Sequence, residues 1–331
     1  MSFRPPFWSP SQAEAIIFDW DGVIAETRLD FSGLREKYYG GRRAMLLEDA
    51  ASLPPSLREA LMLDLEEIEL RGALSADPVP GVTDVIEWTR ENKIPWAVVS
   101  RNCKKSILKA AEVISIDLPE IVRSRDDGDC VKPDPRALSE TCRELGADPA
   151  QTLLIGDFIY DMIGARRAGM RGALVRENIE TGWEEWLEYS CRSMNEFLDG
   201  LISKVEIAPW EYQKTARKYG KDLLAKTAKI TALTPTGPNA RADRWLAAFA
   251  PFGVGTFAVP DVQFSPEDWR KNPSFDPACM GSSLLDAVRS FLRTRFPLAR
   301  AVPAVAGGYD DFPSDPDRAE DFILFLATRD D

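Results

Sequence analysis

Short apolar runs alternate with amphipathic stretches over roughly the first two thirds of the chain. Apolar runs of this length, bounded by polar residues, predict buried strands. They lie at 13–18 (AEAIIF), 95–100 (PWAVVS), 120–124 (EIVRS), 152–157 (TLLIGD) and 172–176 (GALVR). Between them, segments such as 83–92 (TDVIEWTREN) and 135–146 (PRALSETCRELG) place apolar residues at helical spacing. Strands that alternate with helices predict an α/β fold with a doubly wound parallel sheet.

The spacing of these elements predicts three parts. Residues 12–28 and 79–203 form the expected α/β core, and residues 29–78, between its first two strands, predict a small helical insertion. Residues 204–331 predict an additional C-terminal α/β domain. The chain has 331 residues, which suits more than one domain.

The last part of the chain carries an unusual basic segment. Residues 209–229 predict one helix, and beyond it KITAL, VGTFAV and DFILFLA (321–327) predict strands. The basic side chains of the helix are Lys214, Arg217, Lys218, Lys221, Lys226 and Lys229. They admit two interpretations, a solvated linker face or a contact site for a polyanion. The sequence leaves the role of this domain open, including the binding of a protein partner.

The amino-acid composition and net charge argue against several classes of function. The net charge is -12 and the pI about 4.8, so nucleic-acid binding is not expected, because phosphate contacts need Lys and Arg. No apolar run approaches the roughly 18 residues of a membrane span, and the start, MSFRPPFWSPSQ, lacks the apolar core of a signal peptide. The five cysteines lack CxxC spacing and predict reduced thiols. We therefore expect a cytoplasmic protein with no membrane role.

Histidine is absent from the chain. Its absence excludes Ser-His-Asp triads and metal sites with histidine ligands. Acid–base chemistry in this protein must therefore use carboxylates, lysine, tyrosine or cysteine.

Polar side chains lie at the ends of three of the predicted strands. Asp19 and Asp21 follow the first strand, and Ser100 and Asp157 are the last residues of the strands at 95–100 and 152–157. Residues two apart on an extended chain point to the same side. Ligands of such sheets bind at the carboxyl ends of the strands. We expect these side chains, with Lys132 from the loop VKPDP, to converge on one edge of the sheet.

Four clusters in this order resemble the four motifs of the haloacid dehalogenase-like superfamily of phosphatases. They are DWDGV at 19–23, Ser100 in VVSRN, Lys132 in KPDP and GDFIYD at 156–161, and the resemblance covers residues 13–203. Taken alone, each cluster is typical of a turn, a loop or a helix cap. Their occurrence in order favours the catalytic interpretation. The resemblance implies a Rossmann-like core with the insertion at 29–78 as a helical cap.

The resemblance also implies a role for each residue. Asp19 is the expected nucleophile, which forms an aspartyl-phosphate, and Asp21 the general acid and base. The backbone carbonyl of Asp21 joins Asp19 and Asp157 as the expected ligands of Mg²⁺, supported by Asp161. Lys132 supplies a positive charge beside Asp19. The phosphoryl group is expected to bind Ser100, Asn102 and Lys132.

The sequence of the cap gives less information about the substrate than the four motifs give about the reaction. Its loop Gly40-Gly41-Arg42-Arg43 can present Arg42 and Arg43 to a distal anion of the substrate. The alternative is a flexible connection with solvated arginines. The cap is short, which favours an open cleft.

Positions at which this chain departs from the usual family pattern help to choose among the subclasses of the family. Phosphonoacetaldehyde hydrolases resemble this chain in having a Trp at the position of Trp20, but they carry a small residue in place of Asp21. They also need a lysine from the cap, and Lys37 is the only lysine in the predicted cap of this chain. Sugar phosphomutases use a cap histidine, which this chain lacks. We expect a Mg²⁺-dependent phosphatase of a small phosphorylated metabolite. The main alternative is a non-catalytic or accessory protein of this fold whose C-terminal domain binds a partner; phosphomutase and phosphonoacetaldehyde hydrolase are lesser alternatives.

Overall fold

The chain forms two compact units. The structure is a computed structural model that describes residues 7–42, 44–128, 130–296, 298–305, 309 and 312–328. The core unit is Ala13–Lys204, and the C-terminal unit joins the residues before Ala13 to Val205–Asp331. The early residues group with the C-terminal unit because Trp8 and Ile207 exchange backbone hydrogen bonds, with N–O distances of 3.0 and 2.8 Å.

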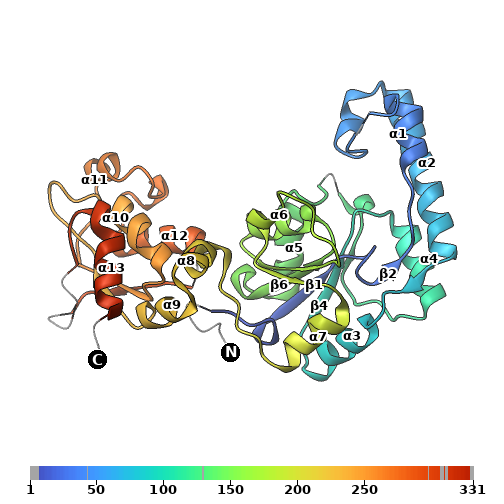
Figure 1. Ribbon diagram of the computed structural model, residues 1–331. Helices are drawn as coiled ribbons and strands as arrows, with labels where there is room; N and C mark the ends of the chain where they lie inside the picture. Colours follow the sequence, from blue (N-terminus) through green and yellow to red (C-terminus); the bar gives the residue numbers. More distant parts are fainter. Residues whose placement is uncertain are drawn as a thin grey trace. The chain divides into compact units, whose positions relative to one another are not determined.

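A parallel six-stranded sheet forms the centre of the core unit (Figure 1). The strand order is β5-β4-β1-β6-β7-β8. The bounds are β1 Ala15–Phe18, β4 Trp96–Val99, β5 Val122–Arg123, β6 Thr152–Gly156, β7 Arg171–Val175 and β8 Tyr189–Cys191. All four side chains of β1 are buried, as expected for a central strand with both faces covered. The predicted α/β fold with a doubly wound parallel sheet is confirmed.

Helices cover both faces of this sheet. They are α3 Val82–Glu91, α4 Lys104–Ile114, α5 Arg136–Leu145, α6 Ile159–Ala168 and α7 Met194–Ile202. Figure 1 shows α5 and α6 above the sheet and α3 and α7 below it. Leu138 of α5 and Ala165 of α6 pack on Ile17 and Leu154 of the sheet. The strand order reverses at β1, which lies between β4 and β6, and a crevice at such a point is where these folds bind ligands.

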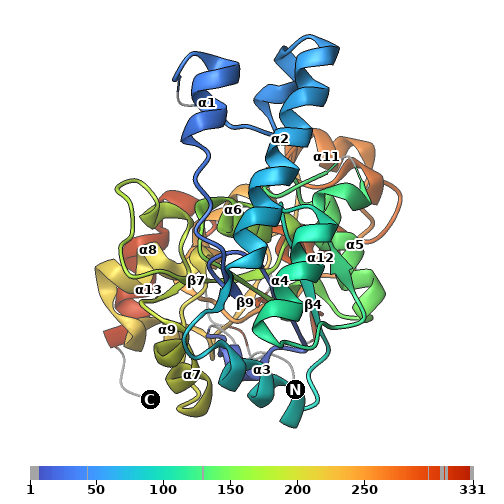
Figure 2. The ribbon, with the colours of Figure 1, turned by 90° about the vertical axis from the view of Figure 1, so that its right-hand side faces the viewer.

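The cap rises from the core unit beside the carboxyl end of the sheet (Figure 2). It contains α1 Ser32–Tyr39, a 3₁₀ turn at Asp49–Ser52 and α2 Pro55–Leu74, and two short antiparallel strands connect it to the core, β2 Ala25–Glu26 and β3 Asp77–Pro78. Its own small core contains Leu34, Tyr39, Ala44, Leu46, Ala50, Leu61 and Leu65. The helix α2 also packs along α4 of the core. The cap is therefore fixed to the core by a helix contact as well as by the two strands.

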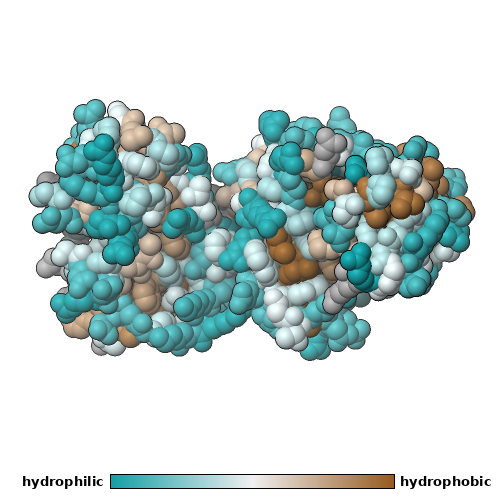
Figure 3. Space-filling model, turned by 90° about the horizontal axis from the view of Figure 1, so that it is seen from above, coloured by the Kyte–Doolittle hydropathy of each residue, from teal (hydrophilic) through white to brown (hydrophobic). Residues whose placement is uncertain are grey.

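The surface at the end of the core unit that carries the cap is mixed in polarity. Figure 3 shows hydrophobic side chains, in brown, exposed among hydrophilic ones at the right-hand end of the view. The large hydrophobic side chains of the cap that are exposed are Met45, Leu57, Leu63 and Leu74.

The C-terminal unit contains a second, smaller parallel sheet. Its order is β11-β10-β9, with bounds β9 Thr231–Leu233, β10 Thr256–Val259 and β11 Arg300–Pro303. The helices are α8 Trp210–Tyr219, α9 Lys221–Thr227, α10 Ala242–Phe249, α11 Pro266–Lys271, α12 Leu284–Arg295 and α13 Ala319–Thr328. Buried aromatic rings contact one another in its interior, among them Trp245, Phe249 and Phe257. The additional C-terminal α/β fold is thus confirmed.

Two sequence-based predictions for this unit were wrong. The apolar run at 321–327 lies in the helix α13 instead of a strand, because Glu320 and Asp321 favour the start of a helix and Ile323 lies buried while Phe325 stays exposed. The basic segment 209–229 forms two helices, α8 and α9, separated at Gly220, whose φ is +84°. No helix in the described part of the chain has the length and apolar character needed to cross a bilayer.

Candidate active site

A cavity of about 410 Å³ opens at the carboxyl end of the six-stranded sheet, between the core and the cap. Its lining includes six residues expected from the sequence: Asp19, Asp21, Ser100, Asn102, Asp157 and Asp161. Their elements explain the convergence, since Asp19 follows β1, Ser100 follows β4, and Asp157 follows β6. These three strands are neighbours in the sheet.

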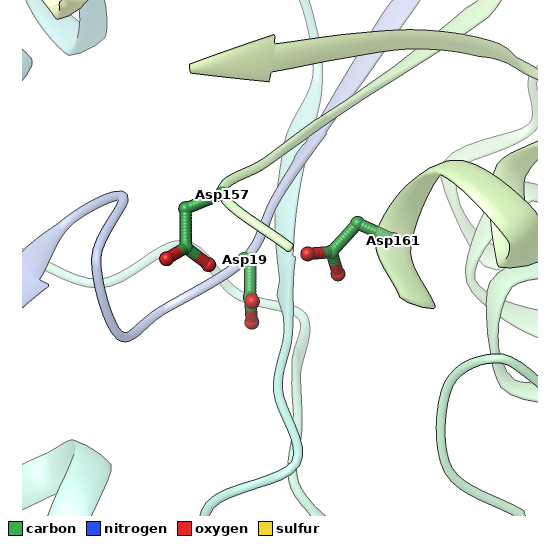
Figure 4. Close-up of side chains that lie close together, drawn as sticks. All are labelled: Asp19, Asp157 and Asp161. Atoms are coloured by element: carbon green, nitrogen blue, oxygen red, sulfur yellow. The ribbon is translucent and has the colours of Figure 1, made fainter. Parts of the chain in front are cut away.

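Three carboxylates form a compact cluster in this cavity. Asp19, Asp157 and Asp161 each offer one oxygen, and these oxygens lie within 4.8 Å of one another. Figure 4 shows the three side chains, from separate segments, pointing toward a common space. Gly22 permits the approach of the Asp157 carboxylate, because a Cβ at Gly22 would lie 2.5 Å from its Oδ2, and the φ of Gly22 is +74°.

Lys132 lies buried beside this cluster. Its Nζ is 2.6 Å from Asp19 Oδ1 and 2.7 Å from Asp161 Oδ1. Burial opposes the charge of Lys132, but Asp161 and Asp19 outweigh it and raise its pKa. The backbone N–H of Trp20 also donates to Asp19 Oδ1, at 2.7 Å. Asp19 is thus held through one of its two oxygens.

The cluster carries more negative charge than Lys132 neutralises. Burial, and next the charge of Asp161, raise the pKa of Asp19 to about 7, although Lys132 opposes this. Burial and the charges of Asp19, Asp161 and Asp21 raise the pKa of Asp157 to about 8, opposed by Arg176, whose Nη1 is 3.8 Å from Asp157 Oδ2. Raised pKa values mean that the ionised carboxylates lack sufficient positive charge nearby, and a hard divalent cation with oxygen ligands would supply that charge.

The Asp21 carboxylate lies outside this cluster. Its Oδ1 accepts a hydrogen bond from the backbone N–H of Thr27, at 3.1 Å, and another from the Thr27 hydroxyl. Burial raises the pKa of Asp21. The side chain lines the cavity, so a protonated Asp21 is placed to donate to a bound molecule.

The segment after β4 is tied to the cap by residues that the sequence analysis missed. The backbone N–H of Asn102 donates to Ser100 Oγ, at 3.1 Å. Glu69, a buried residue of the cap helix α2, accepts from the backbone N–H of Cys103 at 2.9 Å and pairs with Arg125. Glu69 lies four residues after Leu65 and four before Ala73, on the buried stripe of α2, and this helical spacing is a signal that could have identified it.

Arg42 of the cap does not line the cavity, although the sequence analysis considered it for binding a distal anion. Arg42 is exposed, its Nε donates to the Tyr39 carbonyl at 3.1 Å, and it is not among the residues that line the cavity. Arg43 lies outside the described residues. Arg35 and Arg101 line the cavity instead. The position of Arg101 directly after Ser100 is a signal that could have identified it.

The core unit is similar to known hydrolases in sequence and in fold. The sequence profile of the haloacid dehalogenase-like hydrolase family matches residues 44–175. In fold, the chain is similar to a hydrolase from Pseudomonas syringae, with a TM-score of 0.50 and 20% identity over 58% of this chain and 99% of that one. A haloacid dehalogenase-like hydrolase domain thus lies within the core unit.

Curated relatives indicate the type of hydrolase. The hydrolase is 26% identical to pyrophosphatase PpaX of Halalkalibacterium halodurans, over 57% of its own length and 96% of the relative. It is 28% identical to the N-acetylmuramic acid 6-phosphate phosphatase of Pseudomonas aeruginosa, over 49% and 81%. It is also 28% identical to a phosphoglycolate phosphatase of Caulobacter vibrioides, over 48% and 78%. The hydrolase is therefore of the phosphatase type.

Proposed function

We propose that this hydrolase is a Mg²⁺-dependent phosphatase that cleaves a small phosphorylated metabolite through an aspartyl-phosphate. The observation that carries the proposal is the position of Asp19. It projects from the central strand into the cavity, held at one oxygen by Lys132 and grouped with Asp157 and Asp161. A cavity of about 410 Å³ suits a small molecule. The names of the curated relatives, which include a phosphoglycolate phosphatase, support a substrate of this size.

The first step forms a bond between Asp19 and phosphorus. Oδ1 of Asp19 is engaged by Lys132 and Trp20, so Oδ2 is the oxygen that attacks. As the bond from phosphorus to the ester oxygen breaks, Asp21 gives its proton to the leaving alkoxide. Burial raises the pKa of Asp21, which favours the protonated carboxyl group that this step needs. Ser100 and Asn102 bind the phosphoryl oxygens.

The second step releases phosphate. Asp21, now ionised, accepts a proton from water while the water oxygen attacks phosphorus. The bond from phosphorus to Asp19 breaks, and inorganic phosphate leaves with the Asp19 carboxylate restored. The hydrogen bonds from Thr27 orient Asp21 in both steps. This sequence uses carboxylates and a lysine, in keeping with a chain that has no histidine.

Mg²⁺ is the cation that this cluster would hold. Asp19, Asp157 and the backbone carbonyl of Asp21 are the proposed ligands, and Asp161 supports them. When bound, the ion neutralises the repulsion among the carboxylates and the negative charge of the substrate. Lys132 remains the fixed positive charge of the protein beside Asp19.

Hydrolysis of p-nitrophenyl phosphate tests this function. We expect turnover that depends on Mg²⁺, is abolished by EDTA, and is lost in Asp19→Asn. In Asp21→Asn, this activated ester should still form phospho-enzyme while its hydrolysis slows, which trapping of the labelled protein measures. The absence of turnover across a broad panel of phosphate esters, with Mg²⁺ binding intact, would contradict the proposal and favour a binding protein.

A further inference from the structure

Two arginine side chains reach the cavity, and their contacts distinguish them. Arg101 binds both carboxylate oxygens of Glu48, with N–O distances of 2.7 and 2.9 Å. It also donates to the Lys132 carbonyl, and its guanidinium carbon lies 5.0 Å from the ring centre of Tyr160. Its hydrogen-bonding capacity is thus engaged by the protein itself.

Arg35, on the cap helix α1, is engaged far less. Its Nε donates to the Ala44 carbonyl at 3.3 Å. Within the described residues, its two Nη groups make no hydrogen bond or ion pair with the protein. Hydrogen bonds from Ser32, and after them the charge of Arg35, lower the pKa of Asp30, but no ion pair joins Arg35 to Asp30 in the described part of the chain. Arg35 therefore presents a half-buried guanidinium with free donors to the cavity.

Apart from Glu69, whose carboxylate is paired with Arg125, the rest of the cap-side lining is apolar. Leu29, Phe31, Met45, Leu46 and Leu65 line the same cavity as Arg35. A cation placed among apolar side chains is costly unless an anion accompanies it. The carboxylates at the sheet edge are occupied with Lys132 and with the proposed cation, so the missing anion has to come from the bound molecule.

We propose that Arg35 binds a carboxylate on the alcohol portion of the substrate. The preferred substrates are then phosphate esters of small hydroxy acids, and this inference rests on the proposed phosphatase function. A guanidinium matches a carboxylate with two parallel N–H to O hydrogen bonds. A single guanidinium balances the single negative charge of a carboxylate better than the double charge of a second phosphate.

A matched pair of esters tests this subsite. 2-Phosphoglycolate and ethyl phosphate have the same phosphate and nearly the same size, and they differ in the carboxylate. We expect the wild type to prefer 2-phosphoglycolate. Arg35→Gln should lower kcat/KM for this ester roughly ten- to a hundredfold, as expected for lost hydrogen bonds to a charged group. The loss should lie mainly in KM, and activity on ethyl phosphate should stay within about twofold.

Controls separate the subsite from general damage to the cap. Arg42→Gln removes a cap arginine that does not line the cavity, and it should change neither ester. Arg35→Lys keeps the charge and should retain part of the preference. A wild type that does not distinguish the two esters overturns the inference, as does an equal loss on both in an Arg35→Gln protein that remains folded. A wild type that prefers 1,2-ethanediol bisphosphate to 2-phosphoglycolate also overturns it.

Failure of the proposed function has a different signature. A wild type that is inactive on both esters and on p-nitrophenyl phosphate overturns the phosphatase and the subsite together. Turnover of p-nitrophenyl phosphate with no effect of Arg35→Gln on either ester overturns the subsite alone.

Discussion

Arg101 and Glu48 form a two-pronged ion pair that joins the segment after Ser100 to the cap. The N–O distances are 2.7 Å to Oε1 and 2.9 Å to Oε2. The same guanidinium donates to the carbonyl of Lys132, whose ammonium group holds Asp19. The position of the cap is therefore linked through one side chain to two parts of the proposed phosphate site.

Breaking this ion pair should weaken substrate binding more than chemistry. The pair is partly exposed, so we expect Glu48→Ala to lower kcat/KM roughly two- to tenfold, mainly through KM, as the cap closes less firmly. Steady-state kinetics with p-nitrophenyl phosphate measure this. Glu66→Ala is the control, because its pair with Lys105 also joins cap and core but does not line the cavity. Equal effects of the two substitutions would show that the Arg101 pair has no special role.

Lys132 should stabilise the fold as well as the site. Removing one partner of a buried ion pair costs about 3–5 kcal/mol, and Lys132 has two buried or nearly buried partners, Asp19 and Asp161. We expect Lys132→Met to lower the free energy of unfolding in urea by an amount of this order. The double variant Lys132→Met/Asp161→Asn should recover part of the loss, because it removes one of the carboxylates left unpaired. A double variant less stable than the single one contradicts this account.

The metal-free protein should lose stability as the pH rises from about 4 to about 8. The pKa values of Asp19 and Asp157, about 7 and about 8, exceed their ordinary value of 3.8. In this window the folded state binds more protons than the unfolded state, so the free energy of unfolding falls with pH. Urea titrations in EDTA measure it.

The contribution of these two carboxylates can be isolated by comparison. Relative to wild type, Asp157→Asn should flatten the fall between pH 4 and pH 8, since one carboxylate no longer titrates. Millimolar Mg²⁺ should restore stability at pH 8 but not at pH 5, where protons compete with the ion. Wild type and Asp157→Asn curves that run parallel across this range would rule out a raised pKa at Asp157.

Gly22 should be required for cation binding. Gly22→Ala introduces a Cβ 2.5 Å from Asp157 Oδ2 and adds the strain of a positive φ, so the carboxylate must move. We expect weaker Mg²⁺ dependence of activity, measured as the Mg²⁺ concentration at half-maximal rate. Gly40→Ala is matched in backbone conformation, with φ +60° and open space around its Cβ, and it should change stability only. A normal Mg²⁺ response in Gly22→Ala would mean that Asp157 is not a ligand.

The sheet and its edge were predictable because strand ends are set by local sequence. Asp19, Ser100 and Asp157 each follow an apolar run, and the topology of parallel strands brings such positions together. Lys132 was placed correctly beside Asp19, but its equal contact with Asp161 depends on the register of α6, which periodicity does not define.

The cap side of the cavity was not predictable in the same way. Arg35 lies in a helical segment and Arg42 in the loop after it, and nothing in the sequence tells which of the two faces the cavity. Only the folded position of α1 decides this. The last helix, α13, was mistaken for a strand because a continuous apolar run shows neither the helical nor the strand periodicity that would distinguish the two.

The pairing of Trp8 with Ile207 means that the phosphatase is an insertion within another fold. Both of its ends, Ala13 and Lys204, lead into the same C-terminal unit. A chain shortened to end at Lys204 leaves Trp8, now 1% exposed, without Ile207, with which it forms an isolated β-bridge. Clean separation of the phosphatase therefore requires cutting at both borders, before Ala13 and after Lys204.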